Sequence, residues 1–200
     1  VGNHPTRCIR SALKDFKRVK EYSKSEGVIA IGETGLDYHY ERQEQHQLKQ
    51  KIWFRWQIRL SDKLGLPMIL HIRMADEDAI SILRRNKKKL HGGPDVACIY
   101  TEELGLHLGI GGTLLMKSEI SEPLRNAVAA VPMEYLLLET DAPYMKPERP
   151  EGITRKKWAK ARNTSLILPA VVEKIAEIKG ITVDDVLKIT EENTRRLFRL

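Results

Sequence analysis

Val28-Ile-Ala-Ile-Gly32 is a short run of β-forming residues that is closed by a glycine. A polar segment from Gln43 to Lys63 follows, with apolar residues at helical spacing. The strand pattern returns in Leu66-Pro-Met-Ile-Leu-His71, and the helix pattern returns from Asp76 to Lys88. Two consecutive strand–helix units are typical of a parallel sheet that helices cover on both faces.

The same alternation continues through the second half of the sequence. We expect a strand from Leu104 to Ile110 that ends in Gly111-Gly112, and a helix from Glu119 to Ala130. A buried strand is expected at Tyr135-Leu-Leu-Leu-Glu139, and two helices close the chain. The stretch from Lys146 to Asn163 is rich in Pro, Lys and Arg and lacks periodicity, which predicts a long loop. The whole pattern predicts an α/β fold.

Length and composition limit the number of domains. The chain has 200 residues and 42% hydrophobic content, enough for one sizeable core. We therefore expect a single domain over residues 1–200. A complete (β/α)₈ barrel usually takes about 250 residues, so a barrel interpretation has to account for absent strands and helices.

Charge and cysteine content bear on partners and compartment. The 34 Lys and Arg exceed the 27 Asp and Glu, and the formal charge of +7 favours anionic partners such as nucleic acid. A moderate basic balance is also typical of an ordinary solvated surface. Cys8 and Cys98 are too few for a disulfide framework, and the apolar stretches are far shorter than the ~20 residues that cross a bilayer. These features predict a soluble cytoplasmic or nuclear protein without membrane contact.

Three polar groups follow three of the expected strands. Glu33, His71 and Asp141 stand at their carboxyl ends, where parallel α/β barrels carry catalytic groups. Each has an ordinary explanation when taken alone: a turn cap, a core histidine, and a cap before Pro143. Together they supply two carboxylates and an imidazole, which is a ligand set for a divalent metal.

These residues lie within motifs that resemble the TatD family of metal-dependent deoxyribonucleases. The successive signatures are Ile31-Gly-Glu-Thr-Gly-Leu-Asp37, Leu70-His-Ile-Arg73 and Leu138-Glu-Thr-Asp-Ala-Pro-Tyr144, in the family's order. Weaker elements are Val1-Gly-Asn-His-Pro5, Gly109-Ile-Gly-Gly112 and Arg162-Asn163. The resemblance runs over nearly the whole chain and implies a TIM-type (β/α)₈ barrel of the metal-dependent hydrolase type.

The resemblance also implies roles for individual residues. Glu33, His71 and Asp141 are expected to bind metal, and Asp141 to orient the attacking water. His4 is expected in the active site, as a proton donor or a phosphate contact; the alternative is a turn residue before Pro5. A bound cation lowers the pKa of water from ~15.7 toward ~7, which suits phosphodiester hydrolysis. Mg²⁺ is the first expectation for the cation, with Mn²⁺ and Zn²⁺ as alternatives.

Basic and aromatic residues are candidates for contact with DNA. Arg73 can hold a phosphate oxygen through its guanidinium, and the alternative is a surface salt bridge. Trp158 is available to stack on an unpaired base. The expected loop that contains it can track a phosphate backbone or serve only as a solvated loop. Its basic residues are Lys146, Arg149, Arg155, Lys156, Lys157, Lys160 and Arg162.

The sequence departs from the family pattern at two places. It begins after the strand that often carries a His-x-His pair, so ligands from that strand are expected to be absent. Ala97 stands where many members have a histidine, and only a turn fits between Tyr100 and Leu104, so a middle βα unit is also expected to be absent. Truncation of the natural chain and omission of residues from the sequence both account for this. His91 and His107 are possible substitute ligands, although core roles are more typical.

The sequence therefore predicts a metal-dependent deoxyribonuclease, with exonuclease action as the family-based expectation. One alternative is a catalytically impaired relative that binds DNA through its basic surface. Another is an amidohydrolase-like enzyme that acts on a small amide or ester. Occupancy of Glu33, His71 and Asp141 by a metal distinguishes the impaired relative from the enzymes.

Overall fold

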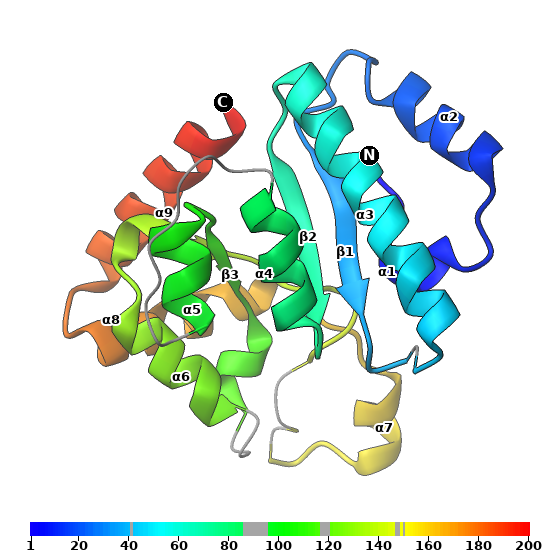
Figure 1. The fold of residues 1–200 in the computed structure, drawn as a ribbon. Helices are drawn as coiled ribbons and strands as arrows, with labels where there is room; N and C mark the ends of the chain where they lie inside the picture. Colours follow the sequence, from blue (N-terminus) through cyan, green and yellow to red (C-terminus); the bar gives the residue numbers. More distant parts are fainter. Residues whose placement is uncertain (41, 86–95, 117–120, 147–148, 150) are drawn as a thin grey trace. The chain divides into compact units, whose positions relative to one another are not determined.

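The computed structural model describes the chain apart from residues 41, 86–95, 117–120, 147–148 and 150. The chain forms two compact units (Figure 1). The first unit comprises Val1–Leu90 together with Leu197–Leu200, and the second comprises His91–Arg196. The single domain expected from length and composition stays a prediction.

The first unit is built on a parallel pair of strands. Strand β1 (Ile31–Asp37) pairs with β2 (Met68–Arg73), and helix α3 (Glu44–Leu64) connects them and packs against β1 (Figure 1). Helix α3 ends at Gly65, which has the left-handed conformation that glycine adopts without strain. This β–α–β unit confirms the predicted order of the elements.

The predicted boundaries of the first strand are wrong. The expected strand ended at Gly32, whereas β1 begins at Ile31 and continues to Asp37. Backbone pairing with β2 overrides the low β propensity of the Gly-Glu-Thr-Gly segment. Gly35 pairs with His71, and a Cβ at Gly35 would overlap the His71 carbonyl oxygen, so this close approach requires glycine. Glu33 and His71 therefore lie within their strands and not after them.

Helices and two hydrophobic clusters complete the first unit. The remaining helices are α1 (Pro5–Cys8), α2 (Leu13–Tyr22) and α4 (Asp76–Arg85). Helix α4 was predicted to reach residue 88, and residues 86–88 lie outside the described part of the chain. One cluster packs Leu36 of β1 against Phe54 of α3 and Ala79 of α4. The other packs Ile31 against Leu60 and Val19, so helices bury apolar side chains against β1.

The second unit contains another parallel pair of strands, β3 (Leu108–Ile110) and β4 (Leu136–Leu138). Its described α-helices are α5 (Val96–Cys98), α6 (Ser121–Ala130), α7 (Arg155–Lys160), α8 (Leu168–Lys179) and α9 (Val183–Phe198), the last two residues of α9 being counted with the first unit. Short 3₁₀ helices span Gly112–Leu115, Met133–Tyr135 and Ser165–Ile167, and a π-helix spans Ile99–Glu103. Ile110, Leu136, Val128 and Val171 belong to its buried core.

Several predicted elements of the second unit differ from the structure. The strand expected from Leu104 is limited to Leu108–Ile110, and helical turns occupy residues 96–103, where only a turn was expected between Tyr100 and Leu104. The expected loop after β4 contains helix α7. Thr154 caps the start of this helix, because its side chain accepts a hydrogen bond from the Lys157 N–H. The helix expected from Glu119 to Ala130 is confirmed from Ser121 onward, and residues 119 and 120 lie outside the described part. The two closing helices are confirmed.

The described residues contain four strands in two parallel pairs, fewer than the eight of a complete barrel. Among these same residues, no helix combines the length and apolar character that spanning a membrane requires.

Candidate metal centre

Two histidines and a glutamate of the first unit come together. His4 stands at the beginning of α1, Glu33 on β1 and His71 on β2, and ligand atoms from the three lie within 4.8 Å of one another. Glu33 and His71 were predicted as ligands, and His4 as another active-site residue. Asp141 belongs to the second unit, so its role as a ligand stays a prediction.

His71 lies between two carboxylates. Its Nδ1 is 3.5 Å from Glu33 Oε1, and its Nε2 is 2.9 Å from Asp37 Oδ2. Metal-binding histidines commonly donate their second ring N–H to a carboxylate, which sets the tautomer. When Nε2–H donates to Asp37, the Nδ1 lone pair faces Glu33 and is available to a cation.

The Asp37 carboxylate is a fixed part of the protein interior. Asp37 is only 1% exposed, and its Oδ1 also accepts hydrogen bonds from the backbone N–H groups of His39 and Tyr40. Asp37 was quoted within the motif of β1, yet no role was predicted for it. The sequence did contain a signal for this role. Alternate residues of a strand point to the same face, and Asp37 lies two residues after Gly35, the residue that pairs with His71.

His4 is oriented by the residue two positions after it. Its Nδ1 lies 2.8 Å from Thr6 Oγ1, and its ring centroid lies 4.5 Å from that of His71, with 61° between the planes. Nδ1 also accepts a hydrogen bond from the Thr6 backbone N–H at 3.3 Å. For Nε2 to offer its lone pair to a cation, Nδ1 would have to carry the ring proton and donate it to the Thr6 hydroxyl instead. The two imidazoles and Glu33 thus form a set of nitrogen and oxygen donors.

The electrostatics of the three groups favour a positive charge among them. The hydrogen bond with Glu33 raises the pKa of His71, although burial opposes this. The same hydrogen bond lowers the pKa of Glu33. Burial lowers the pKa of His4, and the nearby His71 lowers it further, so of the two imidazoles His71 is the one that binds a proton more tightly. A divalent cation at His71 Nδ1 would meet the Glu33 carboxylate while Asp37 holds Nε2, so these donors fit a bound metal.

Two buried glutamines of α3 support both sides of this centre. Gln57 accepts a hydrogen bond from Asn3 N–H at 2.7 Å and donates to the Thr34 hydroxyl at 2.5 Å, next to His4 and Glu33 respectively. Gln50 accepts from Asp37 N–H at 2.8 Å and donates to the Asp37 carbonyl at 3.0 Å. Residues seven positions apart lie on the same face of a helix, so this pair of glutamines indicated buried hydrogen bonds from α3. The sequence analysis did not use that indication.

Arg73, a predicted substrate contact, lies at the end of β2. Its guanidinium lies 5.2 Å from the centre of the exposed Tyr40 ring, and it forms no ion pair with any described residue. The surface salt bridge considered as the alternative stays a prediction. Contact between Arg73 and a substrate stays a prediction.

In the second unit, Asp141 is exposed and has a positive φ of 53°. The buried Asn163 holds the loop around it, because its side-chain amide donates to the Thr140 carbonyl at 2.5 Å and its backbone N–H donates to the Pro143 carbonyl at 3.1 Å. Of the Arg-Asn pair, the buried Asn163 therefore stabilises the loop, whereas the Arg162 side chain is exposed to solvent.

Trp158 lies on α7, and Lys146 covers one side of it. The Lys146 ammonium is 5.3 Å from the centre of the Trp158 ring and donates to the Trp158 carbonyl. Lys146, predicted as a phosphate contact, is thus engaged within the chain. Stacking of a base on Trp158 and contact of Arg162 with DNA stay predictions.

The two histidines considered as substitute ligands have different outcomes. Both ring nitrogens of His107 are buried without a partner among the described residues, and burial lowers its pKa. Its ring packs near Tyr135, and no candidate metal cluster within the described ranges includes it. His91 lies outside the described residues.

Parallel strands that carry clustered imidazole and carboxylate groups define a class, the metal-dependent hydrolases. The chain belongs within that class to the TatD related DNase family, whose model matches residues 1–199. This confirms the resemblance that the motifs of β1, β2 and the Asp141 segment had indicated.

The chain is also similar in sequence to proteins named as a metal-dependent hydrolase and as an exonuclease. The chain is 34% identical over 210 residues to the uncharacterized metal-dependent hydrolase YabD of Bacillus subtilis (strain 168), covering 100% of this chain and 76% of YabD. It is 32% identical over 211 residues to the 3'-5' ssDNA/RNA exonuclease TatD of Erwinia tasmaniensis, covering 100% and 77%.

Solved structures show the same fold. The TatD homologue YJJV from Escherichia coli k12 superposes with a TM-score of 0.83 at 24% identity, covering 100% of this chain and 76% of that one. An uncharacterized amidohydrolase from Saccharomyces cerevisiae superposes with a TM-score of 0.71 at 20% identity, covering 99% and 79%. These likenesses confirm the predicted fold class, the TIM-type barrel of metal-dependent hydrolases.

Proposed function

We propose that this protein is a metal-dependent nuclease that hydrolyses phosphodiester bonds in DNA, acting as an exonuclease on single-stranded ends. The observation that carries the proposal is the cluster of His4, Glu33 and His71, whose ligand atoms lie within 4.8 Å of one another. Relatives named as 3'-5' ssDNA/RNA exonucleases support the choice of a nucleic-acid substrate.

The residues of this chain have separate tasks in the proposed reaction. Glu33, His71 and His4 hold a divalent cation, which supplies a Lewis acid and lowers the pKa of water. Asp37 holds His71 in the tautomer that leaves Nδ1 free. Asp141, assigned from its motif, would add a carboxylate ligand and orient the attacking water. We assign His4 to the cation because its ring is 4.5 Å from that of His71.

The donor set bears on the choice of cation. Imidazole nitrogens suit zinc and other transition metals, whereas Mg²⁺ prefers oxygen ligands and retains several waters. The sequence alone led to Mg²⁺ as the first expectation, before a second imidazole joined the set. With His4 and His71 together, we propose Mn²⁺ or Zn²⁺ ahead of Mg²⁺.

Residues that could contact single-stranded DNA lie near the metal-binding residues along the chain. Arg73 follows His71 by two residues on β2, and its guanidinium stacks on Tyr40, which is 65% exposed. An exposed aromatic ring with a guanidinium beside it suits stacking of an unpaired base and contact with a phosphate. The formal charge of +7 supports binding of a polyanion.

Cleavage of labelled single-stranded and duplex DNA tests the proposal. Wild-type protein is assayed with Mn²⁺, Zn²⁺, Mg²⁺ or EDTA beside Asp141→Ala, Glu33→Gln and a control, Asp62→Ala, which removes an exposed carboxylate on α3. We expect metal-dependent shortening of single strands from one end, retained by the control and reduced at least 100-fold in the two site variants. DNA binding without cleavage by wild type with any cation would instead indicate the impaired relative.

A further inference from the structure

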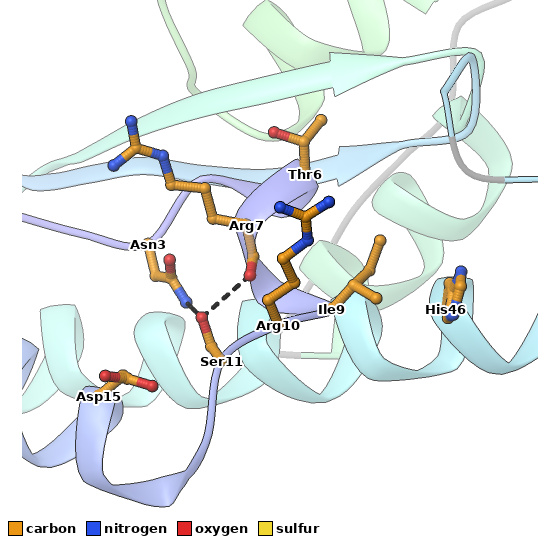
Figure 2. Close-up of a pocket in the computed structure, with 8 residues that line it drawn as sticks. All are labelled: Asn3, Thr6, Arg7, Ile9, Arg10, Ser11, Asp15 and His46. Atoms are coloured by element: carbon orange, nitrogen blue, oxygen red, sulfur yellow. Dashed lines mark hydrogen bonds between the residues drawn. The ribbon is translucent and has the colours of Figure 1, made fainter.

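A pocket of about 640 Å³ opens on the first unit beside α1 (Figure 2). It lies outside the set of His4, Glu33 and His71. Its lining residues are Asn3, Thr6, Arg7, Ile9, Arg10, Ser11, Asp15 and His46. The volume falls within the range of about 300–1,000 Å³ that is typical of small-ligand pockets.

The pocket has an excess of positive charge. Arg7 and Arg10 are exposed, and neither side chain forms an ion pair with a residue that the structure describes. The carboxylate of Asp15 is already engaged, since it accepts from Ala12 N–H at 2.8 Å and lies 3.8 Å from the Arg18 guanidinium. Two arginines therefore line the pocket, and neither forms an ion pair with an acidic residue that the structure describes.

Hydrogen bonds fix the conformation of the segment that carries the two arginines. The Asn3 side-chain amide donates to the Ser11 hydroxyl at 2.8 Å, and that hydroxyl donates to the Arg7 carbonyl at 3.0 Å (Figure 2). The Lys49 ammonium donates to the Ile9 carbonyl at 2.6 Å and ties the same loop to α3. A wall that is already ordered loses little conformational entropy when a ligand binds.

The pocket is linked directly to the metal centre. Thr6 lines the pocket, and its hydroxyl is the partner of His4 Nδ1 at 2.8 Å. Arg7 follows His4 by three residues, about 5 Å along a helix axis at 1.5 Å per residue. A group in this pocket is therefore a near neighbour of a group held by His4.

We propose that this pocket binds a phosphate of the substrate strand adjacent to the phosphate that is cleaved. The proposal rests on the proposed nuclease function. Guanidinium groups present paired N–H donors that match phosphate oxygens, so Arg7 and Arg10 are the binding residues. The pocket thereby sets how far the strand extends past the metal centre.

Binding of a fluorescent ten-nucleotide oligothymidylate, measured in EDTA at several salt concentrations, tests the proposal without cleavage. The variants are Arg7→Ala, Arg10→Ala and the double variant. The control is Arg59→Ala with Lys63→Ala, which removes two exposed charges from α3 that lie about 20 and 25 Å along that helix from His46. We expect the double variant to bind at least tenfold more weakly, and its slope of log affinity against log salt to shrink by about 1.4, or 0.7 per lost contact. The control should change neither quantity comparably.

Inorganic phosphate and thymidine, titrated by nuclear magnetic resonance, form a second arm. Shifts at Arg7 and Arg10 with phosphate and none with thymidine support an anion site. Unchanged affinity and salt slope in the folded double variant would overturn the inference while cleavage by wild type keeps the nuclease proposal. Loss of binding in the double variant, with no cleavage by wild type, would keep Arg7 and Arg10 as a phosphate-binding site but overturn the nuclease and the site's role beside a cleaved phosphate. Wild type that binds neither oligonucleotide nor phosphate overturns the pocket proposal as well.

Discussion

Both ring nitrogens of His71 face carboxylates, and the two carboxylates have different surroundings. Glu33 has a side chain that is 49% exposed and is free to share a cation, whereas Asp37 is buried and fixed by backbone N–H groups. A buried carboxylate that accepts several hydrogen bonds keeps its place when a metal enters. Asp37 therefore acts as a positioning residue for His71.

Asp37→Asn should weaken metal binding by about 10–100-fold while the fold is retained. The new amide would donate to His71 Nε2 and move the ring proton to Nδ1, where it blocks the cation. Calorimetric titration with Mn²⁺ or Zn²⁺ measures the affinity. Asp62→Asn on the exposed face of α3 is the control. Equal metal affinity in wild type and Asp37→Asn would contradict the positioning role.

Without metal, the Glu33–His71 pair should make stability depend on pH. The raised pKa of His71 stabilises the fold below its ordinary value of 6.5, and this contribution is lost as pH rises through the raised value. The lowered pKa of Glu33 stabilises above 4.5, and this contribution is lost as pH falls. The pair therefore contributes most between about pH 4.5 and 6.5. The lowered pKa of His4 acts in the opposite direction and costs stability as pH falls below 6.5.

Glu33→Gln should consequently destabilise the metal-free protein more at about pH 5.5 than at about pH 8.5. Urea unfolding in EDTA at the two pH values measures the difference. Glu26→Gln, at an exposed position before β1, should show no such dependence. A loss of stability that is equal at both pH values would refute the ion pair.

Helix α3 connects the parts of the centre through its buried polar side chains. Its inward face would be expected to carry only apolar residues such as Phe54, yet Gln50 and Gln57 are completely buried there. Each forms hydrogen bonds with the backbone of a segment that carries a site residue. The helix thus sets the distance between the segment of His4 and strand β1.

Gln57→Leu should destabilise the protein by about 1–3 kcal/mol, because Asn3 N–H and the Thr34 hydroxyl lose their buried partner. It should also weaken metal binding, because the segment that carries His4 is no longer held. Urea unfolding and metal titration measure the two effects. The same substitution at the exposed Gln45 should leave metal affinity unchanged. A Gln57→Leu variant that is less stable but binds metal as tightly as wild type would show that Gln57 does not support the metal centre.

The molecule as a whole has two units, and the proposed ligands come from both. His4, Glu33 and His71 belong to the first unit, and Asp141 belongs to the second. Strands β3 and β4 of the second unit pack into a hydrophobic core of their own. A cation with ligands from both units would add stability to each of them, since it binds only the folded state.

Hydrogen exchange with and without metal should therefore show added protection in both units. We expect slower exchange at residues 140–144 as well as around His71, and Asp141→Ala should abolish the effect in the second unit. Alanine in place of exposed Asp184 on α9 serves as the control. Protection confined to the first unit would exclude Asp141 as a ligand.

The order of elements could be read from hydrophobic periodicity, because α3, α6, α8 and α9 have apolar residues at helical spacing. The motifs likewise identified Glu33 and His71. The ends of the elements were harder to predict from the sequence. Strand β1 extends to Asp37 because backbone pairing with β2 outweighs the low β propensity of its residues. Helix α7 was missed because six residues carry too little periodicity.

Residue identity and spacing by themselves determined the family, the α/β class and the candidate ligands, because these are encoded in local pattern. Only the tertiary structure decided that Asp37 holds His71, that Gln50 and Gln57 brace the centre, and that Arg7 and Arg10 share a pocket with Thr6. These relations join residues far apart in sequence or depend on side-chain direction. The physical reason is that a hydrogen bond depends on distances of about 3 Å, which the folded backbone sets and no local pattern encodes.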